Sequence, residues 1–133
     1  MNIVFVDDSK IVLETLKAIT GDVVRELAVD NVNCTFYNDP VEFLHLAQNS
    51  SIEFDLAFFD INMPKLSGFD LTREIKSIEK YRFKPIVAIT TEVSKSAKIE
   101  GKKVGMSGWL VKSTAQNMIK DSLGKINRRV SNR

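Results

Sequence analysis

A continuous apolar segment, Leu56-Ala57-Phe58-Phe59, ends on Asp60 and constrains the fold of this chain more than any other feature. An uninterrupted apolar run of this length is typical of a strand buried on both faces of a parallel sheet. The carboxyl end of such a strand opens into the crevice where open α/β folds place their ligands. A carboxylate in that place is unfavourable without a cation or hydrogen-bond donors. The segment therefore predicts a doubly covered sheet with a functional site around Asp60.

Strand-like and helix-like segments alternate along the chain. Predicted strands cover residues 2–6, 32–37, 56–59, 85–90 and 107–111, and predicted helices cover about 10–28, 40–48, 68–78, 94–104 and 113–126. This alternation specifies an α/β fold with a five-stranded parallel sheet and right-handed crossovers. We expect a single domain over residues 1–133, with a polar tail that frays from about residue 127.

Local signals support these helices. Residues able to cap a helix N-terminus precede each of them, namely Ser9, Asp39, Ser67, Ser94 and Ser113. One apolar stripe of the first helix comprises Val12, Leu16, Ile19, Val23 and Leu27, and the third helix has Leu71, Ile75 and Ile78. Gly101, inside the fourth helix, weakens it, and together with Gly105 and Gly108 it is interpreted as a turn marker.

The composition excludes several classes of protein. A hydrophobic content of 44%, a charged content of 27% and a net charge of +2 are those of a globular protein that attracts neither nucleic acid nor acidic membranes. The single cysteine excludes an internal disulfide, and no apolar stretch approaches the length of a membrane span. We expect a cytoplasmic monomer.

Polar residues follow four of the five predicted strands. Asp7 and Asp8 follow the first strand, Asp60 the third and Lys112 the fifth, while Thr90 ends the fourth. The carboxyl ends of parallel strands share one edge of the sheet, so these groups are expected to meet. Three carboxylates repel one another unless a cation joins them, and Mg²⁺ prefers such oxygen ligands.

The same edge suits phosphoryl chemistry. A backbone carbonyl near Asn62 is a plausible further ligand for Mg²⁺, and Lys112 and Thr90 offer an ammonium and a hydroxyl to phosphoryl oxygens. An aspartate carboxylate can act as a nucleophile and form an aspartyl phosphate. Asp60 is the best candidate because its strand is central.

The motifs that carry these residues resemble response-regulator receiver domains. They are DD after the first strand, DINMP after the third, TTE at the fourth and WLVK at the fifth, in this order over the whole chain. Within that family the chain is most similar to single-domain chemotaxis regulators of the CheY type. The resemblance implies a flavodoxin-like fold with strand order 2-1-3-4-5.

The resemblance also implies roles for the site. Asp60 would accept a phosphoryl group from a CheA-like histidine kinase. Asp8, Asp60 and the Asn62 carbonyl would bind Mg²⁺, with Asp7 acting through a water molecule. Lys112 would pair with the phosphoryl group. On this basis we expect a phosphoacceptor that catalyses its own phosphorylation and autodephosphorylation, and no multi-turnover enzyme.

Output residues follow in the same way. Thr90 would be the switch hydroxyl and Trp109 the switch aromatic, while Asn62 and Glu92 would tune autodephosphorylation. Trp109 could equally be a core or interface residue, because indole is bulky and only donates. The lysines of the fourth helix form either a solvated face or part of a partner-binding surface. By resemblance, the leading partner is the flagellar motor switch.

Three alternatives stay open. The receiver could be a shuttle or a phosphate sink in a phosphorelay. An Mg-dependent phosphatase of the haloacid-dehalogenase type also uses an aspartate nucleophile, although it carries DxDxT where this chain has Asp7-Asp8-Ser9. A degenerate receiver could serve only as an interaction module, because Ser113 replaces the proline that the family usually has after its lysine.

Overall fold

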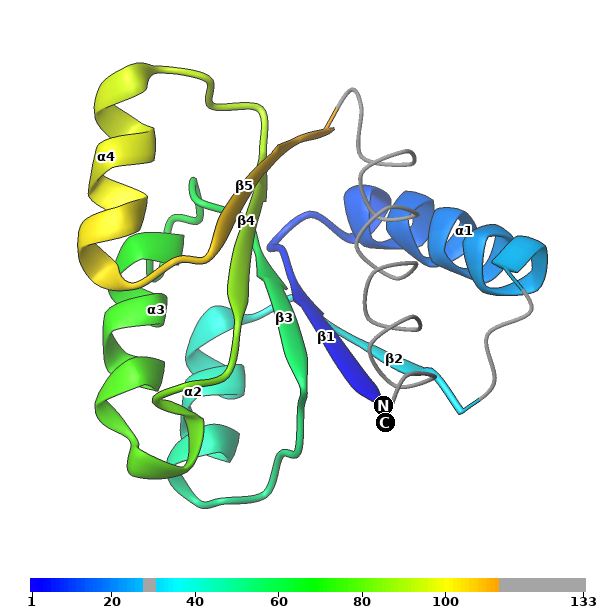
Figure 1. Ribbon diagram of the computed structural model, residues 1–133, viewed down its shortest axis with the longest axis horizontal. Coiled ribbons are helices and arrows are strands. Elements are labelled where there is room, and N and C mark those ends of the chain that lie inside the picture. Colours follow the sequence, from blue (N-terminus) through cyan, green and yellow to red (C-terminus); the bar gives the residue numbers. More distant parts are fainter. Residues whose placement is uncertain (28–30, 113–133) are drawn as a thin grey trace.

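The computed structural model describes residues 1–27 and 31–112 as a parallel five-stranded sheet with helices on both faces (Figure 1). The strands are β1 (Asn2–Val6), β2 (Asn33–Tyr37), β3 (Leu56–Phe59), β4 (Ile86–Thr90) and β5 (Gly108–Val111). Their order is β2-β1-β3-β4-β5, which confirms the flavodoxin-like order expected from the resemblance. β3 is central, so the residue that follows it lies in the middle of the carboxyl edge.

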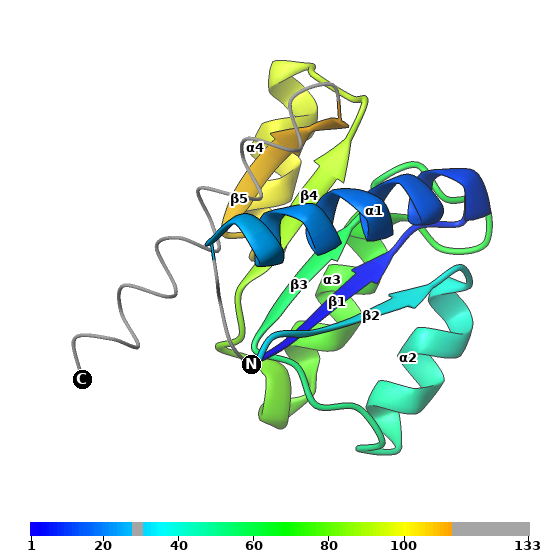
Figure 2. The same cartoon turned by 90° about the vertical axis from the view of Figure 1, so that its right-hand side faces the viewer.

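The described helices are α1 (Lys10–Leu27), α2 (Pro40–Gln48), α3 (Gly68–Ser77) and α4 (Lys95–Val104), with a short 3₁₀ helix η1 (Glu79–Tyr81). Figures 1 and 2 show α2, α3 and α4 on one face of the sheet and α1 on the other. None of these helices is long and apolar enough to cross a membrane.

Alternate strand residues fill two separate cores. On β1, Val4 and Val6 pack with the cluster that includes Phe43 of α2 and Leu71 of α3. Ile3 and Phe5 point to the opposite face, where Leu13, Leu16 and Val23 of α1 cover the sheet. All four residues of β3 are buried, as expected for a strand covered on both faces.

Four of the five predicted helix starts, those at Ser9, Asp39, Ser67 and Ser94, are confirmed by capping hydrogen bonds. Ser9 Oγ accepts from Val12 N at 3.2 Å, Ser67 Oγ from Asp70 N at 3.1 Å and Ser94 Oγ from Ala97 N at 3.2 Å. Asp39 caps α2 through its side chain, and Pro40 occupies the first turn. These contacts satisfy backbone donors that a helix N-terminus otherwise leaves free.

Several details of the sequence interpretation were wrong. Ile78 does not belong to the apolar face of α3, because it adopts an extended conformation (ψ 120°) as the residue that ends the helix. The predicted stripe of α1 does pack on the core, but only Leu16 and Val23 of it are fully buried, and the prediction missed the buried Leu13 and Thr20. Strands β2, β4 and β5 each begin one residue later than predicted. Residues 28–30, the predicted final helix, Ser113 and the tail lie outside the described residues.

The three glycines interpreted as turn markers differ in role. Gly105 ends α4 with φ 102°, a conformation that favours glycine, so this turn is confirmed. Gly101 instead lies within α4, and Gly108 begins β5. For these two the turn interpretation was wrong.

Candidate functional site at the carboxyl edge of the sheet

Two buried aspartates lie at the ends of neighbouring strands. Asp7 follows β1 and is 1% exposed, and Asp60 follows β3 and is 5% exposed. Backbone amides hold one oxygen of each: Ser9 N donates to Asp7 Oδ1 and Ile61 N to Asp60 Oδ1, both at 2.9 Å. Asp8 is exposed beside them. The structure thus brings together the three carboxylates predicted from the sequence.

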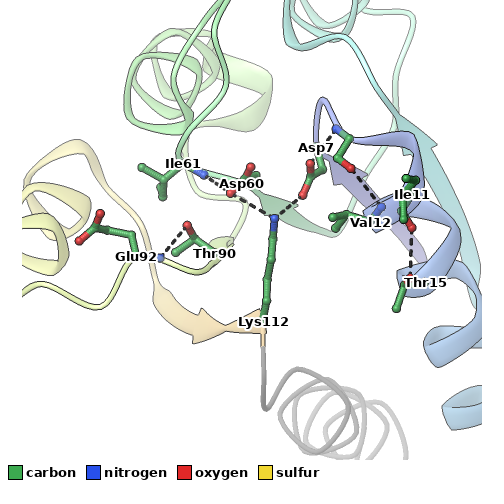
Figure 3. A network of polar contacts seen from close by, with 10 residues as sticks. Asp7, Ile11, Val12, Thr15, Asp60, Ile61, Thr90, Glu92 and Lys112 are labelled. Carbon is green, nitrogen blue, oxygen red and sulfur yellow. Dashed lines mark hydrogen bonds and ion pairs between the residues drawn. The ribbon is translucent and has the colours of Figure 1, made fainter.

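Lys112 reaches this pair from the end of β5. Its Nζ lies 2.8 Å from Asp7 Oδ2 and 3.6 Å from Asp60 Oδ1, between the two carboxylates (Figure 3). The contact with Asp7 is an ion pair that does not have hydrogen-bond geometry. Oδ2 of Asp7 is therefore buried without a hydrogen-bond partner among the described residues. The single ammonium therefore offsets only part of the negative charge of the two carboxylates.

The surroundings of Asp60 disfavour its charged form. Burial raises the pKa of this carboxyl above its ordinary value, and the negative charge of Asp7 raises it further. The ammonium of Lys112, the amide of Ile61 and the hydroxyl of Thr90 act in the opposite direction, but they do not offset the first two effects. A buried carboxyl of this kind gains from an additional cation.

The donor set fits a hard divalent ion. Oxygens of Asp7, Asp8 and Asp60 all lie within 4.8 Å of one another. Two oxygens bound to Mg²⁺ at about 2.1 Å can be at most about 4.2 Å apart. The arrangement suits an ion reached directly by some of these carboxylates and through water by another. The buried Oδ2 of Asp7 is ion-paired with Lys112 but accepts no hydrogen bond from the described residues, so it could also serve as a ligand to an ion.

The sequence predicts Gly68 only as part of a helix start, and its close approach to the backbone of Asp60 was not predicted. A Cβ atom at this position would lie 2.2 Å from the carbonyl oxygen of Asp60 and 2.9 Å from Cα of Ile61. Gly68 N also donates to Ile61 O at 2.9 Å. The first turn of α3 thus packs directly on the backbone of the phosphoacceptor candidate. The only sequence signal is a glycine in a first helical turn, where glycine is otherwise unfavourable.

A short hydrogen-bonded path leads away from the pocket through Thr90. This fully buried residue ends β4, and its Oγ1 accepts from Glu92 N at 3.2 Å. The carbonyl of Glu92 in turn accepts from Trp109 Nε1 at 2.9 Å. The two predicted switch residues, Thr90 and Trp109, are therefore connected through the backbone of a third residue.

The predicted tuning residues lie at the margin. Asn62 is exposed in the loop two residues beyond Asp60, and the ligand role of its carbonyl stays a prediction. The Glu92 side chain points away from Asp60 (Figure 3) and accepts from Ser94 N at 3.1 Å. Hydrogen bonds from Ser94 lower the pKa of Glu92.

Trp109 also borders a groove on the surface of α4 and β5. The indole is half-buried and stacks on Phe69 of α3, with ring centroids 6.2 Å apart. The groove has a volume of about 300 Å³ and is lined by Lys95, Lys98, Ile99, Lys102, Met106 and Trp109, among others. It combines an apolar floor with a rim of ammonium groups.

The comparisons with known proteins agree with this geometry. The family model described as "Response regulator receiver domain" matches residues 3–124. Chemotaxis protein CheY-3 of Vibrio cholerae is 29% identical over 126 residues, covering 95% of this chain and 91% of the relative. Chemotaxis protein CheY of Pseudomonas aeruginosa is 28% identical over 131 residues, covering 98% and 99%.

Solved structures show the same similarity. That of the V. cholerae chemotaxis protein CheY4 has a TM-score of 0.78 and 31% identity, covering 93% of this chain and 96% of that one. The family match, the sheet order and the acidic pocket at the carboxyl edge all point the same way. The chain belongs to the response-regulator receiver domains, the phosphoacceptor modules of two-component signalling.

Proposed function

We propose that this chain is a phosphorylation switch in which the Asp60 carboxylate accepts the phosphoryl group of a CheA-like histidine kinase. The proposal is carried by one observation, the burial of Asp60 beside a second carboxylate, with the ammonium of Lys112 lying between the two. An oxygen of Asp60 attacks phosphorus, the bond between phosphorus and the imidazole nitrogen breaks, and that nitrogen keeps the electron pair. The later release of phosphate to water returns the switch to rest, and no turnover of another substrate is expected.

Asp7, Asp8 and Asp60 would hold Mg²⁺, with the carbonyl of Asn62 as a further ligand. When bound, the ion neutralises negative charge on the transferring phosphoryl group. Lys112, which directly follows β5, adds a second positive charge. Because its Nζ is only 3.6 Å from Asp60 Oδ1, it would reach a phosphoryl oxygen on that carboxylate by a small movement.

Thr90 passes the change outward. Its hydroxyl acts on the Asp60 carboxylate already, and it would donate to a phosphoryl oxygen once one is present. Any movement of Thr90 acts on Glu92 N, which donates to the same hydroxyl, and through the Glu92 carbonyl on Trp109. Phosphorylation would thereby shift the populations of two arrangements of the β4–α4 loop and the indole.

The groove beside Trp109 is the proposed output surface. Its lysines and its apolar floor suit a partner segment that presents acidic and apolar side chains. Similarity to the chemotaxis relatives favours the flagellar motor switch as that partner and chemotaxis as the pathway. By resemblance to the family, Asn62 and Glu92 would tune the rate of autodephosphorylation.

Intact-mass measurement after incubation with acetyl phosphate and Mg²⁺ tests the proposal. The wild type should gain one phosphoryl group, and Asp60→Asn should gain none. Asp22→Asn is the matched control, because this carboxylate is exposed and forms an ion pair with Arg25 at the surface. Equal incorporation in Asp60→Asn would refute the assignment, as would no incorporation into the wild type from either acetyl phosphate or a phosphorylated kinase.

A further inference from the structure

Two glycines lie in described helices beyond the first turn, and their surroundings differ. A Cβ atom at Gly21 in α1 would meet nothing within 4 Å. At Gly101 in α4, a Cβ atom would lie 3.0 Å from Cζ3 and 3.2 Å from Cε3 of Trp109, and 3.4 Å from Sδ of Met106. Glycine is less favourable than alanine at both places, but only at Gly101 does the missing side chain make room for a neighbour.

The indole that lies over Gly101 is held by two further contacts. Its Nε1 donates to the Glu92 carbonyl at 2.9 Å, and its ring stacks on Phe69 with an interplanar angle of 27°. Indole only donates hydrogen bonds, so this inward position depends on a backbone carbonyl being presented to it. α3, the β4–α4 loop and α4 therefore each contribute one contact to the ring.

We propose that Gly101 is a positioning residue of the switch, which admits the indole of Trp109 to its inward position and so keeps it bonded to Glu92. Carbon atoms pack at about 3.5–4.0 Å, so a methyl group at residue 101 displaces the ring by several tenths of an ångström. The ring is confined by Phe69 and by its hydrogen bond, and outward movement relieves the contact. The inference rests on the proposed function in one respect only: it takes the position of the Trp109 indole to be the signal that a partner reads.

The pair Gly101→Ala and Gly21→Ala tests this, first without any phosphodonor and in EDTA. Trp109 is the only tryptophan of the chain, so its emission reports on the indole alone. Gly21→Ala should raise the melting temperature by about 2–5 °C and leave the emission maximum unchanged. Gly101→Ala should raise the melting temperature less, or lower it. Its emission maximum should shift to the red, because the indole becomes more exposed to water.

The same substitutions in a Trp109→Leu background isolate the contact. With the indole removed, Gly101→Ala should raise the melting temperature as much as Gly21→Ala does, measured by circular dichroism. This arm remains decisive if Gly101→Ala alone folds poorly. An equal gain from both alanines with Trp109 present, or an unshifted emission maximum in Gly101→Ala, would overturn the inference.

A last arm adds acetyl phosphate and Mg²⁺, with phosphoryl incorporation followed by intact mass. Gly101→Ala should incorporate the group and show a smaller change of Trp109 emission than the wild type. A wild-type emission change in fully phosphorylated Gly101→Ala would contradict the proposal. If no variant takes up phosphoryl, the proposed function fails, and the arms in EDTA still decide on Gly101.

Discussion

Replacing Asp60 with asparagine should stabilise the metal-free protein. With an effective dielectric constant of 20, attraction between Asp60 and Lys112 across 3.6 Å amounts to about 4.6 kcal/mol. Repulsion between Asp60 and Asp7, whose oxygens are at most 4.8 Å apart, amounts to at least about 3.5 kcal/mol. The attraction and the repulsion nearly cancel. The loss of hydration on burial therefore decides the net effect of the Asp60 charge on stability, and this effect is unfavourable.

We therefore expect Asp60→Asn to raise the free energy of unfolding by about 1–2 kcal/mol at pH 7.5 in EDTA. The pKa of Asp60 is raised in the folded state, so below the unfolded value of about 3.9 the carboxyl is neutral in both states and the gain vanishes. As pH rises through the folded pKa, the wild type loses stability relative to the variant, and the difference then levels off.

Urea denaturation between pH 4 and pH 8 measures this difference. Asp22→Asn, at an exposed ion pair with Arg25, should stay within about 0.5 kcal/mol of the wild type throughout. A variant Asp60→Asn that is less stable than the wild type at pH 7.5, or whose gain is independent of pH, would refute the reasoning. The pairing with Lys112 would then outweigh the cost of burial.

Three further results are expected. Lys112→Met leaves the Asp7 carboxylate buried without its ammonium, so urea denaturation in EDTA should show a loss of about 3 kcal/mol; an unchanged midpoint would contradict this. Gly68→Ala forces a Cβ atom against the Asp60 carbonyl, so it should lose more than about 2 kcal/mol of stability in the same assay. It should also slow phosphoryl incorporation, measured by intact mass. Wild-type behaviour in both measurements would show that the close approach is unimportant. Mg²⁺ at ten times its dissociation constant should stabilise the wild type by about 1.4 kcal/mol in thermal melts, reversibly with EDTA; an equal effect on Asp60→Asn would place the ion elsewhere.

Much of this site could be predicted because strand ends are encoded locally. The apolar run before Asp60 and the short run before Asp7 each show where a strand stops. Parallel topology then brings the ends together without further information. Lys112 follows from the same argument, since it directly follows β5.

Contacts set by tertiary packing could not be predicted in this way. Nothing local indicates that Gly68 lies against the Asp60 carbonyl or that Gly101 makes room for an indole eight residues later. The Trp109–Glu92 hydrogen bond depends on how α4 sits against the sheet. Ile78 was assigned to α3 because its spacing continues the helical period, and the helix end that overrides this period has no strong sequence signal.

The convergence of Asp7, Asp8 and Asp60 on one ion is the central claim, and paramagnetic broadening in NMR spectra tests it most directly. Substoichiometric Mn²⁺, used in place of Mg²⁺, should broaden the backbone amide signals of Asp8, Asp60 and Ile61 first, and excess Mg²⁺ should restore them. Broadening that spares these amides, or that persists unchanged in Asp60→Asn, would contradict the account.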